Sequence, residues 1–298
     1  MMDKREFHVA SRSELLPYLL GLPIGLSRKQ AKDLLKFQAV TVRGRMRVRH
    51  DTLLAPGDIV EIAARRQVRE RSLERIGLRI VHLDDAIVVI DKPAGMLSMG
   101  SENEKEKTAH RMLNEHLKAL ARPPRQQVFI VHRLDRETSG LMLFARSESA
   151  QAALQRNWKD VTKRYLAIVA GTPSNASGTL RDNLVESKSF KMHRVEKGGE
   201  AAITHYRVLK TYKERSLLEL ILETGRKHQI RVQLAAIGHA ILGDRKYGAT
   251  TEPARRLALH SCELRFRHPL SGVAMEFHSA LPTTLKVLIE HRRIMRTK

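Results

Sequence analysis

A charged stretch at residues 65–77, RRQVRERSLERIG, divides the sequence into two parts. It has no convincing apolar face, so it is predicted to be a linker and not an element that packs on a core. We therefore expect one domain at residues 1–64 and a second at residues 78–298. A chain of 298 residues with 42% apolar content is large enough to build a core in both.

The charge of the chain predicts the kind of partner it binds. Lys and Arg number 54 against 32 Asp and Glu, a formal net charge of +22 that is spread along the whole sequence. An excess of this size predicts a polyanion, with nucleic acid ahead of an anionic membrane. No apolar run approaches the roughly 20 residues of a membrane-spanning helix. Because no secretory signal opens the sequence, the expected location is the cytoplasm.

Residue types also limit metal and cofactor chemistry. Cys262 is the only cysteine, which excludes an internal disulfide and a thiolate zinc cluster. The 14 histidines form no HExxH motif and no closely spaced pair with a carboxylate, so no metal site is predicted. No glycine-rich loop has the spacing of a phosphate-binding or dinucleotide-binding motif. We expect no cofactor.

The first part of the chain combines basic helices with a small sheet. Helices are predicted at residues 15–25 and 27–37, the second opened by a Ser and a Gln spaced as in a capping box, and short strands with Gly turns follow. The order of helices, VRG turn and PGD turn over about residues 11–63 resembles the S4 RNA-binding domain. The resemblance implies RNA contacts by helix and turn cations, namely Arg28, Lys29, Lys32, Arg43 and Arg45. A merely solvated basic face is the alternative.

The second part alternates short apolar runs with helical patterns. Strands are predicted within residues 78–92 and at 128–131, 141–145, 164–169, 202–209, 216–224 and 257–266, and helices at 108–121, 147–160, 228–237 and 284–296. Residues 171–200 are rich in turn residues and are predicted to be a surface loop or irregular strand.

One connection between two of these strands, HRLDRETSG at residues 132–140, places the carboxylate of Asp135 between Arg133 and Arg136. Rigid strands present binding and catalytic groups on such connections. A surface turn with a solvated ion pair is the alternative. Taken alone, Tyr165 is more often a half-buried strand tyrosine than a catalytic group, and Arg231 more often a surface cation.

Four motifs in order change that balance. HRLDRETSGLMLFA, RYLAIVAG, TGRKHQIRVQLAAIGHAILGDRKYG and LALHSCELRFRHPLSG, preceded by IDKPAG, resemble the RluA-like family of RNA pseudouridine synthases over about residues 78–282. The resemblance implies an α+β fold, with an S4 domain of two helices and a short antiparallel sheet before the catalytic domain. In the catalytic domain it implies a mixed, mainly antiparallel β-sheet flanked by helices.

The resemblance also implies roles for three residues in turning uridine into pseudouridine. Asp135 matches the aspartate that acts as nucleophile or forms an adduct while the bond between uracil N1 and ribose C1′ breaks. Arg231 matches the arginine that pairs with this aspartate and keeps it ionised. Tyr165 matches the tyrosine that lies against the base, and it is a candidate for removing the C5 proton or only for stacking.

The substrate uridine must leave its stack before the reaction. Arg133 matches the arginine proposed to fill the vacated place, and Arg136 and Lys163 are expected to hold phosphates. Three further residues are expected to support the site structurally, namely His132, Gln229 and Val232.

The chain departs from the family pattern at Lys227, where Thr is usual, at Gln233, where His is frequent, and at residues 96–99. These departures put substrate fit in doubt. Ribosomal RNA of the large subunit is the favoured substrate, and transfer RNA remains open. The alternative from another class is a non-catalytic RNA-binding protein of ribosome assembly. We expect a monomer, and the sequence does not reveal the target uridine.

Overall fold

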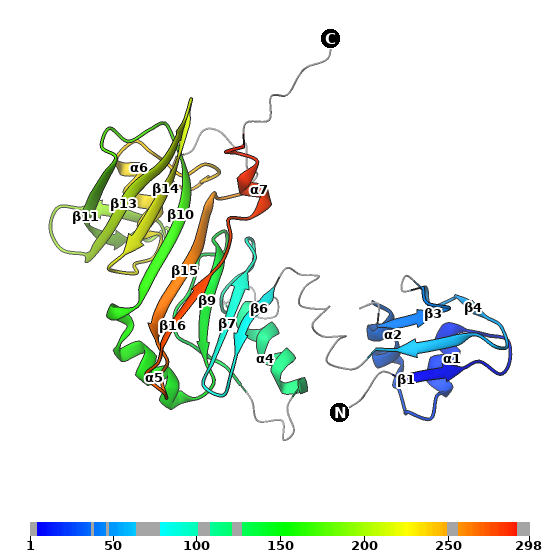
Figure 1. Ribbon diagram of the computed structural model, residues 1–298. Coiled ribbons are helices and arrows are strands. Elements are labelled where there is room, and N and C mark those ends of the chain that lie inside the picture. Colours follow the sequence, from blue (N-terminus) through cyan, green and yellow to red (C-terminus); the bar gives the residue numbers. More distant parts are fainter. Residues whose placement is uncertain are drawn as a thin grey trace, which may run out of the picture. The chain divides into compact units, whose positions relative to one another are not determined.

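A computed structural model describes residues 5–36, 39–45, 48–63, 78–100, 108–120, 127–248 and 256–290 (Figure 1). The chain divides into two compact units, one of Met1–Gly77 with His116–Arg125 and one of Leu78–Glu115 with Gln126–Lys298. The predicted linker at residues 65–77 lies outside the described residues. Among the described residues no helix is long and apolar enough to cross a membrane.

The N-terminal unit packs two helices on a small sheet. Its elements are β1 (Arg5–His8), β2 (Ser13–Glu14), α1 (Leu15–Gly21), α2 (Arg28–Lys36), β3 (Val40–Val42), β4 (Leu53–Leu54) and β5 (Ile59–Ile62). Strands β1, β5 and β3 form an antiparallel sheet in that order, and β2 pairs with β4. Side chains from the helices and the sheet, such as Leu19 and Val60, meet in one buried core.

Both predicted helices of this unit are confirmed. The first ends earlier than expected, because Leu22 precedes a proline and therefore takes an extended conformation with ψ 144°. The second begins with the predicted capping box. Gln30 N donates to the Ser27 hydroxyl at 3.2 Å, and Ser27 N donates to the Gln30 side chain at 2.8 Å.

The C-terminal unit is built on an eleven-stranded sheet in which β12-β11-β13-β14-β10-β15-β9-β7-β6 are neighbours, β16 pairs with β15, and β8 pairs with β9. The strands are β6 (Arg79–Leu83), β7 (Ile87–Lys92), β8 (Phe129–Ile130), β9 (Ser139–Ala145), β10 (Thr162–Ala170), β11 (Ser177–Glu186), β12 (Met192–Val195), β13 (Glu200–Tyr212), β14 (Arg215–Leu222), β15 (Leu259–Arg267) and β16 (Ala274–His278). Only the β9–β15 pair is parallel within the described part of the sheet. The predicted mixed, mainly antiparallel sheet is confirmed.

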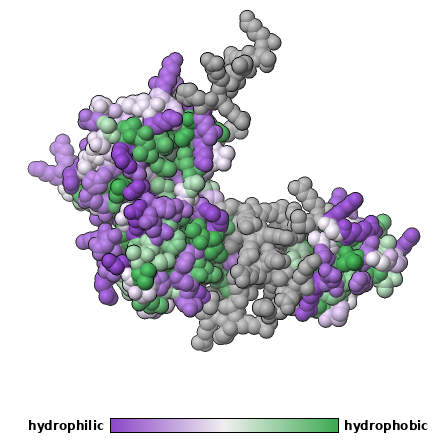
Figure 2. Space-filling view, in the orientation of Figure 1, coloured by the Kyte–Doolittle hydropathy of each residue, from purple (hydrophilic) through white to green (hydrophobic). Residues whose placement is uncertain are grey.

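Helices flank this sheet. They are α4 (Ala109–Leu120), which begins in this unit, α5 (Glu148–Arg156), the 3-10 helix η1 (Trp158–Asp160), α6 (Gln229–Ala236) and α7 (Thr283–Lys286). Ser147 caps α5 by accepting the Ala150 N–H at 3.1 Å. Leu154 of α5 belongs to the same buried cluster as Leu143 of β9 and Phe266 of β15, so this helix packs against these strands. In the view of Figure 1 the surface is largely hydrophilic, with hydrophobic areas on strands that face the viewer (Figure 2).

Three expectations about elements were wrong or incomplete. Residues 171–200, predicted as a surface loop or irregular strand, contain two regular strands, because β11 pairs with β13 from Ser177↔Arg207 to Leu184↔Glu200 and β12 pairs with β11. Pairing with a distant strand satisfies the backbone of this polar segment, which its own composition does not indicate. β16 was not predicted. The final helix is Thr283–Lys286 where residues 284–296 were expected, and residues 291–296 lie outside the described residues.

Candidate active site

The loop that carries Asp135 joins β8 to β9 and is held on both sides of the aspartate. The Ser98 hydroxyl donates to Leu134 O at 2.6 Å and accepts the Leu134 N–H at 3.0 Å. The carbonyl of Arg136 accepts from Gly95 N at 2.8 Å. These bonds tie the loop to the turn after β7, so the position of Asp135 is set by a neighbouring strand as well as by its own. Its side chain is 19% exposed.

A buried lysine completes this clamp. Lys92, the last residue of β7, is 0% exposed, and its ammonium donates to the carbonyls of Pro93, Met96 and Arg136 at 2.9, 2.8 and 3.2 Å. Burial lowers the pKa of Lys92 to about 7, although the charge of Asp135 acts in the opposite direction. Lys92 therefore anchors the backbone of the Asp135 loop and places a titratable group beneath it.

Arg231 of α6 contacts two carboxylates. Its Nε and Nη2 donate to Asp244 at 2.8 Å each, and Nη1 donates to Oδ2 of Asp135 at 3.3 Å. Burial opposes the charge of this guanidinium, but the hydrogen bond and charge of Asp244 outweigh it and raise the pKa of Arg231. Asp244 itself is 1% exposed and also accepts the backbone N–H groups of Lys246 and Tyr247. The predicted pair of Asp135 and Arg231 is thus present, with Asp244 as the carboxylate that orients the arginine.

His228, just before α6, faces Asp135 from another direction. Its Nε2 lies 3.8 Å from Oδ2 of Asp135, and its Nδ1 is 2.7 Å from the Tyr247 hydroxyl, which accepts the Met192 N–H at 3.0 Å. Burial lowers the pKa of His228 to about 4, more than Asp135 raises it. The neutral ring is satisfied when Tyr247 donates to Nδ1, and this assignment leaves the N–H at Nε2 directed toward Asp135.

Tyr165 lies on β10 where that strand pairs with β14 and β15. It is 7% exposed, and the pairing with β15 is irregular between Arg164 and Tyr165. Burial raises the pKa of Tyr165, and the nearby charge of Asp135 raises it further. The hydroxyl therefore stays protonated at neutral pH, which suits a group that packs against a base better than one that removes a proton.

The remaining predicted site residues separate into exposed and buried groups. Arg133 and Arg136 are exposed on either side of Asp135 in the loop. Lys163 is only 5% exposed, and its ammonium donates to Trp158 O at 3.3 Å and lies 5.7 Å from the centre of the Trp158 ring. Burial lowers the pKa of Lys163. Because its ammonium is enclosed, the structure does not place Lys163 where the predicted phosphate contact requires it.

The three residues expected to support the site are all engaged in packing. His132 accepts the Leu143 N–H at 2.9 Å and stacks on Trp158 with ring centres 4.7 Å apart. Gln229 donates to Ile203 O at 3.0 Å and to the Thr204 hydroxyl at 2.9 Å. Val232 belongs to the buried cluster between α6 and strands β11, β12 and β13.

In the N-terminal unit the predicted cations are exposed, namely Arg28, Lys29, Lys32, Arg43 and Arg45. Arg43 differs from the others because its guanidinium donates twice to Asp58, at 2.5 and 2.6 Å. That pair joins the turn after β3 to the turn before β5, so Arg43 has a structural partner in addition to any RNA contact.

Sequence reasoning missed four residues of this site, namely Lys92, His228, Asp244 and Tyr247. All four lie within the quoted motifs, but the motifs do not state which groups meet. The signal that was available is the acidic residue in GDRKYG, because a lone carboxylate in a basic segment needs a cation partner once it is buried.

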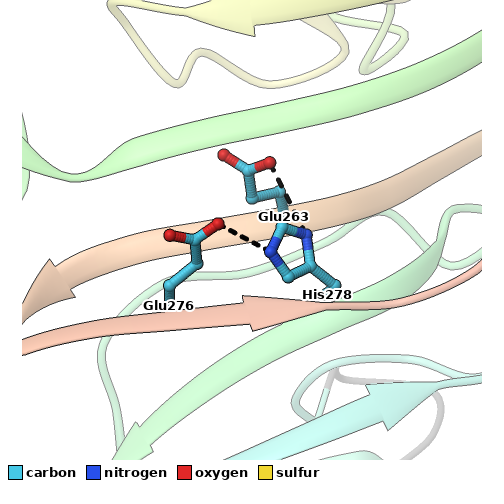
Figure 3. A group of neighbouring side chains, drawn as sticks. All are labelled: Glu263, Glu276 and His278. Carbon is cyan, nitrogen blue, oxygen red and sulfur yellow. Dashed lines mark hydrogen bonds and ion pairs between the residues drawn. The ribbon is translucent and has the colours of Figure 1, made fainter.

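Glu263, Glu276 and His278 form a cluster on β15 and β16 with metal-binding residue types (Figure 3). Arg265 Nε lies 2.7 Å and Arg164 Nε 3.7 Å from the Glu263 carboxylate, and His278 lies 2.6 Å from Glu276. Two guanidinium groups already compensate the buried carboxylate and would repel a divalent cation. The cluster is therefore an ion-pair network, and the absence of a metal stays a prediction.

Taken together, a carboxylate 19% exposed on a clamped loop, paired with an oriented arginine in a strongly basic chain, has the features of an enzyme that acts on a polyanion. The family model described as RNA pseudouridylate synthase matches residues 86–236. The chain is therefore a member of the RNA pseudouridylate synthase family, and it is an RNA pseudouridine synthase. The predicted family is confirmed.

Individual relatives agree with this assignment. The chain is 36% identical to ribosomal large subunit pseudouridine synthase D of Vibrio cholerae over 86% of this chain and 84% of that protein. It is 33% identical to the protein of the same name in Salmonella typhimurium over 90% and 86%. The solved structure of human RNA pseudouridylate synthase domain containing 4 superposes with a TM-score of 0.60 at 26% identity, covering 74% of this chain and 94% of that one. The family match begins after the N-terminal unit, for which the S4 assignment stays a prediction.

Proposed function

We propose that the protein converts specific uridines of large-subunit ribosomal RNA to pseudouridine, with Asp135 as the nucleophile. The observation that carries the role of Asp135 is its geometry. It is the carboxylate of the loop that accepts from the oriented Arg231 and still keeps 19% of its side chain exposed. Bacterial relatives 33 to 36% identical over most of the chain, named for the ribosomal large subunit, support the substrate.

The reaction rearranges one nucleotide without adding or removing atoms overall. Attack by the Asp135 carboxylate on C1′ forms a covalent bond there as the bond between N1 and C1′ breaks. The base then turns, and C5 bonds to C1′ as the bond between Asp135 and C1′ breaks, which returns the carboxylate. The C5 proton is then lost and N1 gains one. Covalent catalysis divides the exchange into two steps and holds the detached base in place. Arg231 compensates the negative charge on Asp135 and does not exchange protons, because its guanidinium is bound to two carboxylates.

Tyr165 packs against the base in this proposal. Since burial raises the pKa of its hydroxyl, it accepts or relays the C5 proton poorly at neutral pH, and stacking is the role we assign to it. The exposed Arg133 fills the place that the flipped uridine leaves, and the exposed Arg136 binds a phosphate. The exposed cations of α2 give the N-terminal unit an RNA-binding role of the S4 type. In this proposal the protein acts as a monomer in the cytoplasm.

The proposal is tested with unmodified large-subunit ribosomal RNA and pseudouridine mapping. Wild type should modify defined uridines, and Asp135→Asn should lower the rate by on the order of 1,000-fold or more while the RNA still binds. Asp85→Asn is the matched control, because the Asp85 side chain is fully exposed and lies outside the site.

Two outcomes contradict parts of the proposal. Modification of transfer RNA but not of ribosomal RNA by wild type would contradict the substrate and leave Asp135 in its role. Identical blank maps for wild type and Asp135→Asn on both RNAs would favour a non-catalytic assembly protein.

A further inference from the structure

The hairpin between β11 and β12 carries an exposed aromatic residue in a strained conformation. Phe190 is 70% exposed and has a φ of 57°, in the left-handed region that residues with a large side chain rarely adopt. Gly or Asn would adopt this conformation more easily. Four hydrogen bonds between Ser187 and its partners Phe190 and Lys191 close the loop and hold Phe190 in place.

Cations surround this aromatic ring. Lys227 Nζ lies 5.5 Å from the ring centre, and Lys246 Nζ donates to the carbonyl of Phe190 at 2.7 Å. Burial and the charges of Lys227 and Arg231 lower the pKa of Lys246, whereas the charges of Glu186 and Asp135 raise it. Glu186 at the end of β11 also pairs with Lys227. Lys188 and Lys191 flank Phe190 in sequence and are exposed.

The hairpin tip is also connected to the Asp135 site. Met192, two residues after Phe190, donates its N–H to the Tyr247 hydroxyl at 3.0 Å. Tyr247 contacts His228 at 2.7 Å, and His228 lies 3.8 Å from Asp135. Lys227 immediately precedes His228 in the chain. The hairpin that carries Phe190 is therefore connected to Asp135 through these contacts, unlike an isolated hydrophobic residue on a protein surface.

We propose that Phe190 is a stacking surface for an unpaired nucleobase that neighbours the target uridine, with the exposed Lys188 and Lys191 on the adjacent phosphates. An exposed aromatic face beside cations is the arrangement with which proteins hold unpaired bases, since every base offers a π-face and every nucleotide a phosphate. This inference rests on the proposed RNA substrate, and it adds a contact that holds the strand on one side of the flipped nucleotide.

The test is a double-mutant cycle on binding by the full-length chain. The probes are an oligouridylate of roughly 12 nucleotides, within the site size of single-strand binding proteins, and the same strand made abasic at every position except the central one. Phe190→Ala should weaken binding of the first probe by about 10-fold, the effect of one lost stacking contact. It should leave binding of the abasic probe unchanged, and Phe190→Trp should retain wild-type affinity.

Two controls separate stacking from other effects. Leu270→Ala removes a side chain that is 66% exposed at the β15–β16 turn, and it should bind both probes as wild type does. Stacking releases no counterions, so Phe190→Ala should keep the wild-type slope of log affinity against log salt, whereas Lys191→Gln should reduce that slope by about 1. Thermal unfolding of Phe190→Ala should match wild type, because the side chain is exposed.

Equal affinity of wild type and Phe190→Ala for the first probe overturns the inference, as does an equal loss on both probes or no binding of the first probe by wild type. These outcomes are independent of the proposed function, because oligouridylate binding requires neither turnover nor a ribosomal target. An enzyme that modifies ribosomal RNA but shows no coupling in this cycle keeps its function and loses this contact.

Discussion

Among single residues, Arg231 donates hydrogen bonds from its guanidinium to two carboxylates that differ in exposure. Asp244 is 1% exposed and accepts two hydrogen bonds from it, whereas Asp135 is 19% exposed at the side chain and accepts one. The buried carboxylate fixes the fork geometry, and the exposed one remains accessible to a substrate. The orientation of the arginine therefore depends on a residue that need not touch RNA.

Asp244→Asn tests this division. Removing one charge of a buried pair leaves the other uncompensated, so we expect the free energy of unfolding to fall by about 3 kcal/mol and the turnover of the folded enzyme to fall as well. Arg231→Lys should also lose turnover, because an ammonium cannot reproduce the two-pronged contact. Urea unfolding and single-turnover pseudouridine formation measure the two effects. Glu219→Gln, which disrupts the ion pairs of Glu219 with Arg164 and Arg207, should lower stability only. Unchanged turnover in Asp244→Asn would contradict the positioning role.

Lys92 makes stability depend on pH in a direction that can be worked out. Its pKa falls from 10.5 to about 7 on folding, so between these values the unfolded chain binds more protons than the folded one. The free energy of unfolding should therefore rise with pH across this interval. Below about pH 7 the contribution of Lys92 to it should not change with pH. Between pH 7 and pH 9.5 the free energy of unfolding of wild type should rise by about a few kcal/mol relative to that of Lys92→Met, as measured by urea unfolding. A pH-independent difference between the two proteins would show that Lys92 is not neutralised on folding.

At the scale of elements, the Asp135 loop depends on the parallel contact between β9 and β15. Gly140 of β9 has a φ of 112°, and a Cβ at this position would lie 2.1 Å from the carbonyl oxygen of Ser261. The strands pair here through His260↔Ser139 and Ser261↔Gly140. Only glycine allows the backbones of β9 and β15 to approach this closely, and Gly140 lies five residues after Asp135.

Gly140→Ala should separate the two strands and displace the loop. We expect a loss of at least about 3 kcal/mol in stability, since backbone atoms rather than a flexible side chain must move. Gly225→Ala is the control, because no atom lies within 4 Å of a Cβ at that glycine, and it should change stability by no more than about 0.5 kcal/mol. Similar melting temperatures for the two variants would contradict the account of the β9–β15 contact.

At the scale of the whole molecule, the formal net charge of +22 predicts RNA binding that weakens steeply with salt. The exposed cations of α2 lie in a different unit from Asp135. Their contribution to binding can therefore be removed without altering the site at which the base reacts.

The combined substitution of Arg28, Lys29 and Lys32 by Gln should reduce the slope of log affinity against log salt by about 2 and leave the rate of the bound complex unchanged. Filter binding over a salt series and single-turnover kinetics give the two quantities. Arg49→Gln, whose guanidinium is exposed and already paired with Asp51, is the control and should change neither. An unchanged slope in the triple variant would contradict an RNA-binding role for α2.

Features that depend on neighbouring residues could be predicted from the sequence. The capping box of α2, the helix that begins after Ser147 and the strands on either side of the Asp135 loop all follow from residues close together in the chain. The ordered motifs also identified the family and the pairing of Asp135 with Arg231. In these cases the local pattern and the final structure agree.

Other features follow from packing in three dimensions. The fold makes regular strands of residues 177–186 and 192–195, encloses Lys92 and Lys163, and joins Asp244 to Arg231. Some of these partners are near in sequence, such as Asp244 and Arg231, which are 13 residues apart. Burial of a polar group nevertheless depends on which elements pack over it, and residue spacing alone does not contain that information.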